Sequence, residues 1–333
     1  MEPFTKNISY LFKGDKQFII FVINQEFFKM KFYSLILAAA LLMWNNECHA
    51  QLSDIQPLWP NGIPGNPVKY KTEKLTTNTF RLSSLSRSNR VYSCVSEPGY
   101  VIHKPENGKA NGAAMVICPG GGFRDVWFDR EGNDLAIFLA QQGVTCLVLK
   151  YRTFNTGEEG FKLEWKDYAP HVYADARQAI YILRSRAKEL GIDINKTGIG
   201  GFSAGGSLSM MVALNMYEKE LPEYASFGQI NTAPDFIGLF YPGLNQGYMD
   251  MAKKAGTFPP VFIMNGGEDT TTPAANCIEL YNILTSKKIS VEIHIYSKGG
   301  HGFDSGVERG NGIASWRDSF VLWLKDRGFI SEK

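Results

Sequence analysis

The chain of 333 residues is poor in several features that define whole classes of protein. Its 35 Lys and Arg face 33 Asp and Glu, so the formal net charge is only +2. That balance lacks the basic field with which proteins neutralise nucleic-acid phosphates, and we expect no nucleic-acid partner. The five cysteines include no Cys-x-x-Cys spacing, which argues against a zinc site. Cys118 and Cys146 lie inside apolar runs, where cysteine acts as a small buried hydrophobe. We expect no metal and no cofactor.

Apolar runs long enough to span a membrane are lacking too. The N-terminal run at residues 32–44 (FYSLILAAALLMW) is shorter than the roughly 20 residues that a spanning helix needs. Lysines precede it, and a polar segment that ends in Cys48-His49-Ala50 follows it, which is the order of a secretory signal peptide. We expect a signal peptide at residues 30–50, cleaved after Ala50, and residues 1–29 to be an upstream extension from a misassigned start codon. The alternative is an uncleaved anchor extended by the apolar residues 18–23.

Export to the periplasm or the extracellular space follows from such a signal, with no stable membrane insertion after cleavage. No internal repeat, low-complexity tract or linker divides residues 51–333, so we expect them to form a single catalytic domain. A polar stretch up to about Arg90 should lie on the surface. The sequence carries no signal for an oligomeric state.

Beyond Arg90, short apolar runs alternate with longer amphipathic stretches. This alternation predicts an α/β fold in which a mostly parallel central sheet of about eight strands carries helices on both faces. The expected strands are residues 91–95, 100–103, 113–118, 144–151, 197–201, 236–241, 261–265 and 291–296. The expected helices are residues 133–142, 172–190, 204–216, 274–286 and 315–325.

The strongest local pattern is Gly201-Phe202-Ser203-Ala204-Gly205, where an expected strand must turn into an expected helix. A nucleophile on such a strained turn needs small neighbours, because its own backbone is crowded and the helix packs close behind it. Ser203 is therefore the candidate nucleophile. The alternative is an ordinary helix-capping serine in a glycine-rich turn, since the five-residue pattern is weak when it stands alone.

A serine hydroxyl needs a base to take its proton, and the scarcity of histidine narrows the choice. Three of the five histidines leave with the signal or precede the nucleophile, where the chain order of strand-end triads does not place a base: His49, His103 and His171. His294 alternates with apolar residues on an expected strand, which indicates a structural role. His301, in a flexible Gly-Gly-His-Gly loop after the last strand, is the candidate base; the alternative is a solvated loop histidine.

The imidazole in turn needs a carboxylate that holds its tautomer. Asp269 leaves the end of the expected strand 261–265 and is the candidate acid. Glu268 is its immediate rival, and Asp235 and Asp250 fit less well because they precede this strand, although Asp250 stays open.

Acyl transfer also needs donors aimed at the developing oxyanion. The run Pro119-Gly120-Gly121-Gly122-Phe123 follows the expected strand 113–118 directly, and residues without side chains let backbone N–H groups approach a substrate oxygen. We assign the N–H groups of Gly121, Gly122 and Ala204 as the oxyanion hole. A lone glycine run is usually a turn, but this one follows the strand that the arrangement requires.

Together, the segments PGGGF, GFSAGG, GGEDTTTP and GGHGF resemble the α/β-hydrolase superfamily from about residue 57 to residue 329. The narrower resemblance is to exported bacterial acetyl-xylan-esterase-like, or esterase/lipase-like, proteins. It rests on LWPNGIPG, Glu131-Gly132, Leu149-Lys150-Tyr151-Arg152, Asp175-Ala176-Arg177-Gln178-Ala179 and GFSAGG. The resemblance implies the same triad and the same glycine loop. The family often has Tyr at Phe123, so a hydroxyl contact at that position is in doubt.

The resemblance implies an exported serine carboxylesterase that removes small acyl groups, acetyl foremost, from plant-type polysaccharide or oligosaccharide. Phe123, Trp127 and Trp165 are candidates for a sugar-binding cleft, because aromatic faces stack on sugars; packing in the core is the alternative. Related sequences labelled endo-xylanases do not change this expectation, since no facing carboxylate pair for glycoside hydrolysis is evident here.

Three other functions stay open. One is a general short-chain esterase. Another is a prolyl-oligopeptidase-like serine peptidase, although residues 51–333 leave no room for the large gate that usually covers such enzymes. The third is a catalytically inactive hydrolase fold that binds glycans.

Overall fold

The computed structural model describes residues 8–10, 21–23, 55–63, 66–82, 85–106, 108–307 and 309–331. The chain divides into two compact units, Met1–Asp54 and Ile55–Lys333. In the first unit, β1 (Ile8–Tyr10) and β2 (Phe21–Ile23) pair antiparallel. The expected signal peptide lies outside the described residues, as does the expected upstream extension apart from these two strands. Within the described ranges, no helix is long and apolar enough to cross a membrane.

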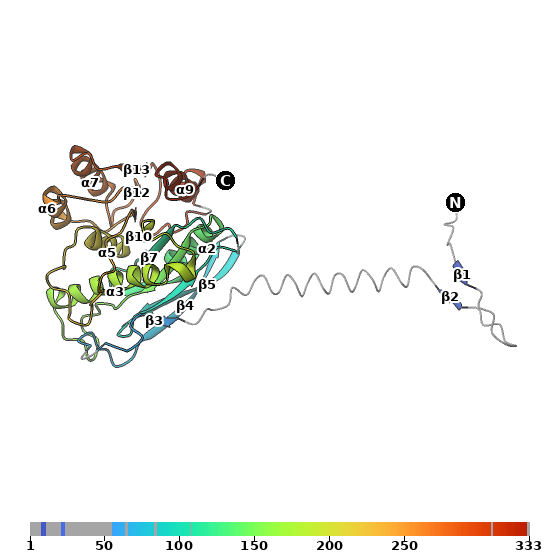
Figure 1. The fold of residues 1–333 in the computed structure, drawn as a ribbon, viewed down its shortest axis with the longest axis horizontal. Helices are drawn as coiled ribbons and strands as arrows, with labels where there is room; N and C mark the ends of the chain where they lie inside the picture. Colours follow the sequence, from blue (N-terminus) through green and yellow to red (C-terminus); the bar gives the residue numbers. More distant parts are fainter. Residues whose placement is uncertain are drawn as a thin grey trace. The chain divides into compact units, whose positions relative to one another are not determined.

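The second unit is built around an eight-stranded sheet with the spatial order β13-β12-β11-β10-β7-β9-β6-β3 (Figure 1). The six strands from β13 to β9 are parallel, and β6 and β3 are added antiparallel at one edge. Their bounds are β3 (Gln56–Pro57), β6 (Gly99–His103), β7 (Ala114–Cys118), β9 (Thr145–Lys150), β10 (Thr197–Phe202), β11 (Ile237–Phe240), β12 (Val261–Gly266) and β13 (Val291–Tyr296). Every residue of the five strands β7 and β9–β12 is buried, as expected where helices cover both faces of a parallel sheet. The predicted sheet is confirmed.

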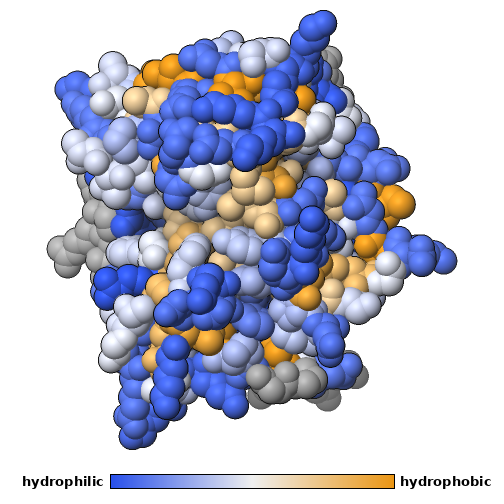
Figure 2. All heavy atoms as spheres, turned by 90° about the vertical axis from the view of Figure 1, so that its left-hand side faces the viewer, coloured by the Kyte–Doolittle hydropathy of each residue, from blue (hydrophilic) through white to orange (hydrophobic). Residues whose placement is uncertain are grey.

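Helices connect the parallel strands. The long α3 packs beside α5, and both lie against β7 and β10, while α7 packs on β12 and β13 (Figure 1). The helices and the short π-helical turn η1 are η1 (Asp129–Asn133), α2 (Asp134–Gln141), α3 (Trp165–Ser185), α4 (Ala187–Leu190), α5 (Ala204–Ala213), α6 (Gln246–Lys254), α7 (Ala274–Ser286), α8 (Asn311–Ala314) and α9 (Trp316–Asp326). On the face seen in Figure 2, hydrophilic residues predominate and hydrophobic ones emerge only in scattered patches.

One predicted strand was assigned to the wrong sheet. Residues 91–93 end β5 (Leu85–Ser93), which pairs with β4 (Lys74–Leu82) and β8 (Asp125–Trp127) in a separate three-stranded antiparallel sheet. Residues 74–78, which are polar apart from Leu75, are exposed, as expected, so this hairpin lacks the apolar alternation by which strands are recognised. The eighth place in the central sheet belongs instead to β3, which is too short to leave a pattern.

Two helices also differ from the prediction. α3 starts at Trp165, seven residues earlier than expected, and carries Pro170 within its second turn. A proline normally marks a helix boundary because it lacks the N–H donor of the helical ladder, which is why the sequence pattern placed the start after it. The helix α6 was not predicted; Asn245 caps it by accepting a hydrogen bond from the Tyr248 N–H.

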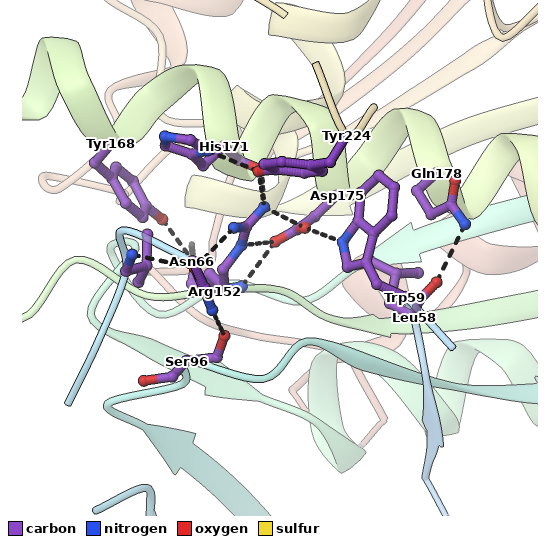
Figure 3. Close-up of polar contacts among 11 residues, drawn as sticks. Leu58, Trp59, Asn66, Ser96, Arg152, Tyr168, His171, Asp175, Gln178 and Tyr224 are labelled. Atoms are coloured by element: carbon purple, nitrogen blue, oxygen red, sulfur yellow. Dashed lines mark hydrogen bonds and ion pairs between the residues drawn. The ribbon is translucent and has the colours of Figure 1, made fainter. Parts of the chain in front are cut away.

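A buried ion pair joins α3 to the end of β9 (Figure 3). Arg152 Nη2 lies 2.7 Å from Asp175 Oδ1, and Arg152 Nε lies 2.9 Å from Asp175 Oδ2. Both side chains are fully buried. Trp59 Nε1 donates to Asp175 Oδ1 at 2.9 Å, and Arg152 Nη1 donates to Asn66 Oδ1 at 3.2 Å. The pair therefore ties the Pro/Gly-rich segment at the start of the unit to both the sheet and α3.

The same guanidinium continues into a tyrosine–histidine pair. Arg152 Nη2 donates to the Tyr224 hydroxyl at 2.9 Å, and that hydroxyl lies 2.7 Å from His171 Nδ1 (Figure 3). Burial, together with the nearby Arg152 charge, lowers the pKa of His171 to about 4. His171 is therefore neutral at pH 7 and accepts the hydrogen bond from Tyr224, so the network holds one positive and one negative charge.

Replacing Asp175 by Asn should leave Arg152 as a buried cation without its counter-ion. We expect the free energy of unfolding to fall by about 3–5 kcal/mol, measured by urea denaturation. Glu159→Gln is the matched control, because it breaks the exposed Lys71–Glu159 pair, whose N–O distance is 3.2 Å, and should change stability by less than about 1 kcal/mol. Equal, small effects of the two substitutions would contradict the role given to the buried pair.

Candidate active site

Ser203 occupies a sharp turn between β10 and α5, with φ 50° and ψ −116°. A positive φ is strained for a residue with a side chain. The glycines around it are required by space: a Cβ on Gly201 would lie 2.4 Å from the Cys118 carbonyl oxygen, and one on Gly205 only 1.9 Å from it. The Ser203 side chain makes no helix-capping hydrogen bond, so the alternative of an ordinary capping serine does not hold.

The structure brings the three residues of the predicted triad together. Ser203 Oγ lies 2.9 Å from His301 Nε2, and His301 Nδ1 lies 2.8 Å from Asp269 Oδ2. Asp269 follows β12 and His301 follows β13, so all three stand just beyond the carboxyl ends of parallel strands. With Nδ1–H donating to the carboxylate, Nε2 is left to accept the serine proton. The His301 side chain is one-quarter exposed, so it is not a solvated loop residue.

Several donors fix the Asp269 carboxylate. Oδ1 accepts from the backbone N–H groups of Thr271 and Thr272, at 2.9 and 2.8 Å, and Oδ2 accepts from the Thr272 hydroxyl at 2.8 Å. The Thr272 hydroxyl also lies 3.0 Å from His301 Nδ1. Thr272, which the sequence analysis did not single out, thus helps to aim the acid at the base. The rival Glu268 points elsewhere, accepting from the Gly299 N–H at 3.1 Å.

The glycine loop after β7 lies against the nucleophile, since a Cβ on Gly120 would stand 3.0 Å from the Ser203 Cβ. The Gly120 N–H is taken, because it donates to Glu131 Oε2 at 2.8 Å. By contrast, the N–H groups of the predicted donors Gly121, Gly122 and Ala204 make no hydrogen bond within the part of the chain that the structure describes. They stay the predicted oxyanion hole.

Of the three aromatic residues predicted to bind substrate, Phe123 and Trp165 contact each other, and Trp127 lies on β8. The rings of Phe123 and Trp165 pack edge to face, with centroids 5.0 Å apart. Phe123 is buried, whereas Trp165 is 37% exposed at the start of α3. Trp127 is on β8 of the small sheet, with the Arg130 guanidinium 5.5 Å from its ring centre. Trp165 is therefore the most exposed of the three, and its contact with Phe123 places it beside the glycine loop.

His294 lies apart from the triad on β13, where its Nε2 is 2.7 Å from Glu292 Oε1 and its ring packs on Phe262. Two residues that the sequence did not assign to the site also touch its loops: the buried carboxyl of Glu131 and the hydroxyl of Tyr241, 2.8 Å apart. Glu131 appeared in the sequence only as part of the family resemblance, and Tyr241 only as the end of an expected strand.

Metal ligands do not gather near these groups. Among the described residues, no three His, Cys, Asp or Glu side chains come close enough to hold a metal ion. The four described cysteines are buried and unpaired, and burial raises the pKa of Cys118 and Cys277 to about 12. The hydrogen-bonded serine, histidine and aspartate are the groups that acyl transfer requires.

A fluorophosphonate probe tests this nucleophile directly. We expect it to phosphonylate Ser203, to fail on Ser203→Ala, and to react at least about 10³-fold more slowly with His301→Ala, because the hydroxyl then keeps its proton. The rate is measured by mass spectrometry of the intact protein. His294→Ala removes a histidine of the same sheet edge and should leave the rate unchanged; the reverse result for the two histidines would refute the assignment of the base.

Two protein-family models match successive segments of the domain. A family model described as BD-FAE matches residues 101–239, and the model of the prolyl oligopeptidase family matches residues 243–327. An acetylxylan esterase of Xylanibacter ruminicola is 29% identical over 62% of this chain and 44% of its own length. The endo-1,4-beta-xylanase B of Butyrivibrio fibrisolvens is 27% identical over 56% of this chain and 32% of its own. The chain thus spans less than half of the length of these curated relatives.

Solved structures agree on the fold. An acetyl ester-xyloside bifunctional hydrolase from Caldicellulosiruptor lactoaceticus superposes with a TM-score of 0.59 at 23% identity, covering 84% of this chain and 97% of its own. A carboxylesterase from Lactobacillus plantarum gives a TM-score of 0.57 at 17% identity, covering 78% of this chain and 100% of its own. Its sheet, its strand-to-helix turn and these solved structures show that the chain has the α/β-hydrolase fold.

Proposed function

We propose that this protein is a serine carboxylesterase that removes small acyl groups, acetyl foremost, from an acylated plant-type polysaccharide or oligosaccharide. The observation that carries the reaction is the continuous hydrogen-bond chain from Ser203 through His301 to Asp269. The observation that favours the substrate is the similarity to an acetylxylan esterase. An exposed Trp165 beside the glycine loop offers a face on which a sugar ring can stack.

The reaction starts when Ser203 Oγ attacks the ester carbonyl carbon while His301 Nε2 takes the serine proton. The carbonyl oxygen becomes an oxyanion, which the N–H groups of Gly121, Gly122 and Ala204 stabilise. Asp269 stabilises the imidazolium that forms. The tetrahedral intermediate then collapses, the sugar alkoxide leaves with the proton from His301, and the acyl group stays on Ser203.

Water completes the cycle. His301 removes a proton from a water molecule as its oxygen attacks the acyl carbon, and the second tetrahedral intermediate expels Ser203 Oγ. The serine regains its proton from His301, and the carboxylic acid departs. No redox partner and no cofactor takes part in either half of the reaction.

Acetate release from acetylated xylan is the decisive measurement, with p-nitrophenyl acetate and butyrate run beside it. We expect release from the polysaccharide, and acetate preferred over butyrate. Ser203→Ala should lower kcat by about 10⁶-fold, since the nucleophile is lost while substrate binding is kept. Activity on the aryl esters alone would reject the carbohydrate assignment and retain the esterase. No hydrolysis of any ester, and no phosphonylation, would favour an inactive glycan-binding fold.

A second candidate is a serine peptidase, because the prolyl oligopeptidase family model covers the segment that carries Asp269 and His301. The same triad would cleave an amide by the same steps. Hydrolysis of a peptide p-nitroanilide faster than of p-nitrophenyl acetate would favour the peptidase over the esterase.

We also propose that the protein is exported after cleavage behind Ala50. The order of charged, apolar and small residues at positions 29–50 supports this. N-terminal sequencing of the protein recovered from the periplasm or the medium should begin at Gln51. Recovery of a chain that starts at Met1 or Met30 would contradict it.

A further inference from the structure

A carboxyl group with no assigned task is buried between the loops of the active site. Glu131 Oε2 accepts the Gly120 N–H at 2.8 Å, and Glu131 Oε1 accepts the Tyr241 hydroxyl at 2.8 Å. A Cβ on Gly120 would lie 2.3 Å from Glu131 Oε2 and 3.0 Å from the Ser203 Cβ. Gly120 is therefore held between Glu131 on one side and the nucleophile on the other, directly before the predicted oxyanion donors.

Tyr241 extends this contact to the loop of the base. Its hydroxyl accepts the Asp304 N–H at 3.0 Å, three residues after His301. Its ring packs edge to face on the imidazole of His301, with centroids 5.3 Å apart. Its carbonyl oxygen lies 3.1 Å from the Thr272 hydroxyl, beside the acid. Tyr241 thus touches the loops of both the base and the acid.

The backbone of Tyr241 is strained, which indicates that the contacts of its side chain stabilise this conformation. Directly after β11, its φ is +36°, a value that a residue with a side chain adopts only where the surroundings enforce it. The side chain is fully buried. A tyrosine in this conformation needs contacts that offset the strain, and the hydroxyl contacts to Glu131 and Asp304 supply them.

The hydrogen-bond pattern favours the ionised form of Glu131. Both partners of Glu131 are donors, so each of its oxygens must accept, and a proton on either would face a donor. Burial raises the pKa of Glu131, while its hydrogen bonds to Tyr241 and Gly120 oppose the rise. The charged groups that face it are Arg130 and Asp304, and Arg130 Nε pairs with Asp304 Oδ2 at 2.8 Å. A glutamine would satisfy only one of the two donors.

We propose that Glu131 and Tyr241 form a positioning pair that sets the spacing between the oxyanion loop and the His301 loop. Among the described residues, neither side chain makes a hydrogen bond to Ser203, His301 or Asp269. It acts through Gly120 on the donors at 121 and 122, and through Asp304 and the imidazole contact on the base. This inference rests on the proposed ester hydrolysis for its kinetic readout, but the reactivity of Ser203 tests it separately.

The expected effect follows from geometry. Loosening the pair lets the oxyanion donors and the base move relative to Ser203, and a shift of about 1 Å in such groups lowers a rate by about 10²-fold. Glu131→Gln and Tyr241→Phe should each lower kcat by about 10- to 100-fold, with KM almost unchanged, because the oxyanion exists only after binding. Phosphonylation of Ser203 should slow to a similar extent, since it also places negative charge on an oxygen of the probe in the oxyanion hole.

The double variant separates a pair from two independent contacts. If Glu131 and Tyr241 act through one hydrogen bond, Glu131→Gln/Tyr241→Phe should be no slower than the slower single variant. Tyr173→Phe and Glu218→Gln are matched controls: Tyr173 is also a buried tyrosine that donates to a glutamate, at 2.9 Å, but on α3 away from the loops. These controls should keep kcat and the labelling rate of the unchanged protein.

Each result decides the question. Rates equal to those of the controls, or losses that multiply in the double variant, would overturn the positioning pair. Thermal melting identifies a variant that fails to fold; if Glu131→Gln fails, the Tyr241→Phe kinetics decide alone, because that change removes one oxygen atom. If the unchanged protein hydrolyses no ester, the proposed function fails, and the labelling rates still support or overturn the pair.

Discussion

The active site depends on one close contact, between the carbonyl oxygen of Cys118 at the end of β7 and the turn that follows β10. No side chain fits there: added Cβ atoms at Gly201 and Gly205 would both collide with that oxygen. Because the turn lies so close to the end of β7, the glycine loop that follows this strand lies against Ser203. The same contact therefore places the proposed nucleophile and sets the predicted oxyanion donors beside it.

Two sets of buried polar groups stabilise the structure around this contact: the Arg152–Asp175 ion pair, and Glu131 with its hydrogen-bond donors. Arg152 and Asp175 neutralise each other and bind the start of the domain to the sheet and α3. The Glu131 carboxyl, by contrast, accepts hydrogen bonds from two neutral donors, the Gly120 N–H and the Tyr241 hydroxyl. A buried carboxylate without an ion partner is unfavourable unless every oxygen is hydrogen-bonded. Each oxygen of Glu131 has a donor, and these hydrogen bonds offset the unfavourable burial of the carboxyl between the two loops.

Much of the site could be predicted because its residues carry strong local constraints. The turn at Ser203 requires glycines at fixed positions, and the small number of histidines left His301 by elimination. The contribution of Thr272 and Tyr241 could not be predicted, since each acts through contacts between loops that are far apart in the sequence. In the fold, parallel strands were recognised by their apolar runs, whereas the polar β4–β5 hairpin and the two-residue β3 leave no such pattern.

The strain at Ser203 is sustained because its backbone is fixed at both ends. Its N–H donates to the Phe240 carbonyl at 3.0 Å, and its own carbonyl accepts from Ser207 at 3.1 Å and Gly243 at 3.0 Å. A residue in such a region of φ and ψ is about 1–3 kcal/mol less stable than in a relaxed one, and three backbone hydrogen bonds of about 1 kcal/mol each offset this. With the main chain unable to relax, only the side chain keeps freedom, and its hydroxyl is directed at His301. The strain thus orients Ser203, the proposed nucleophile, toward the proposed base.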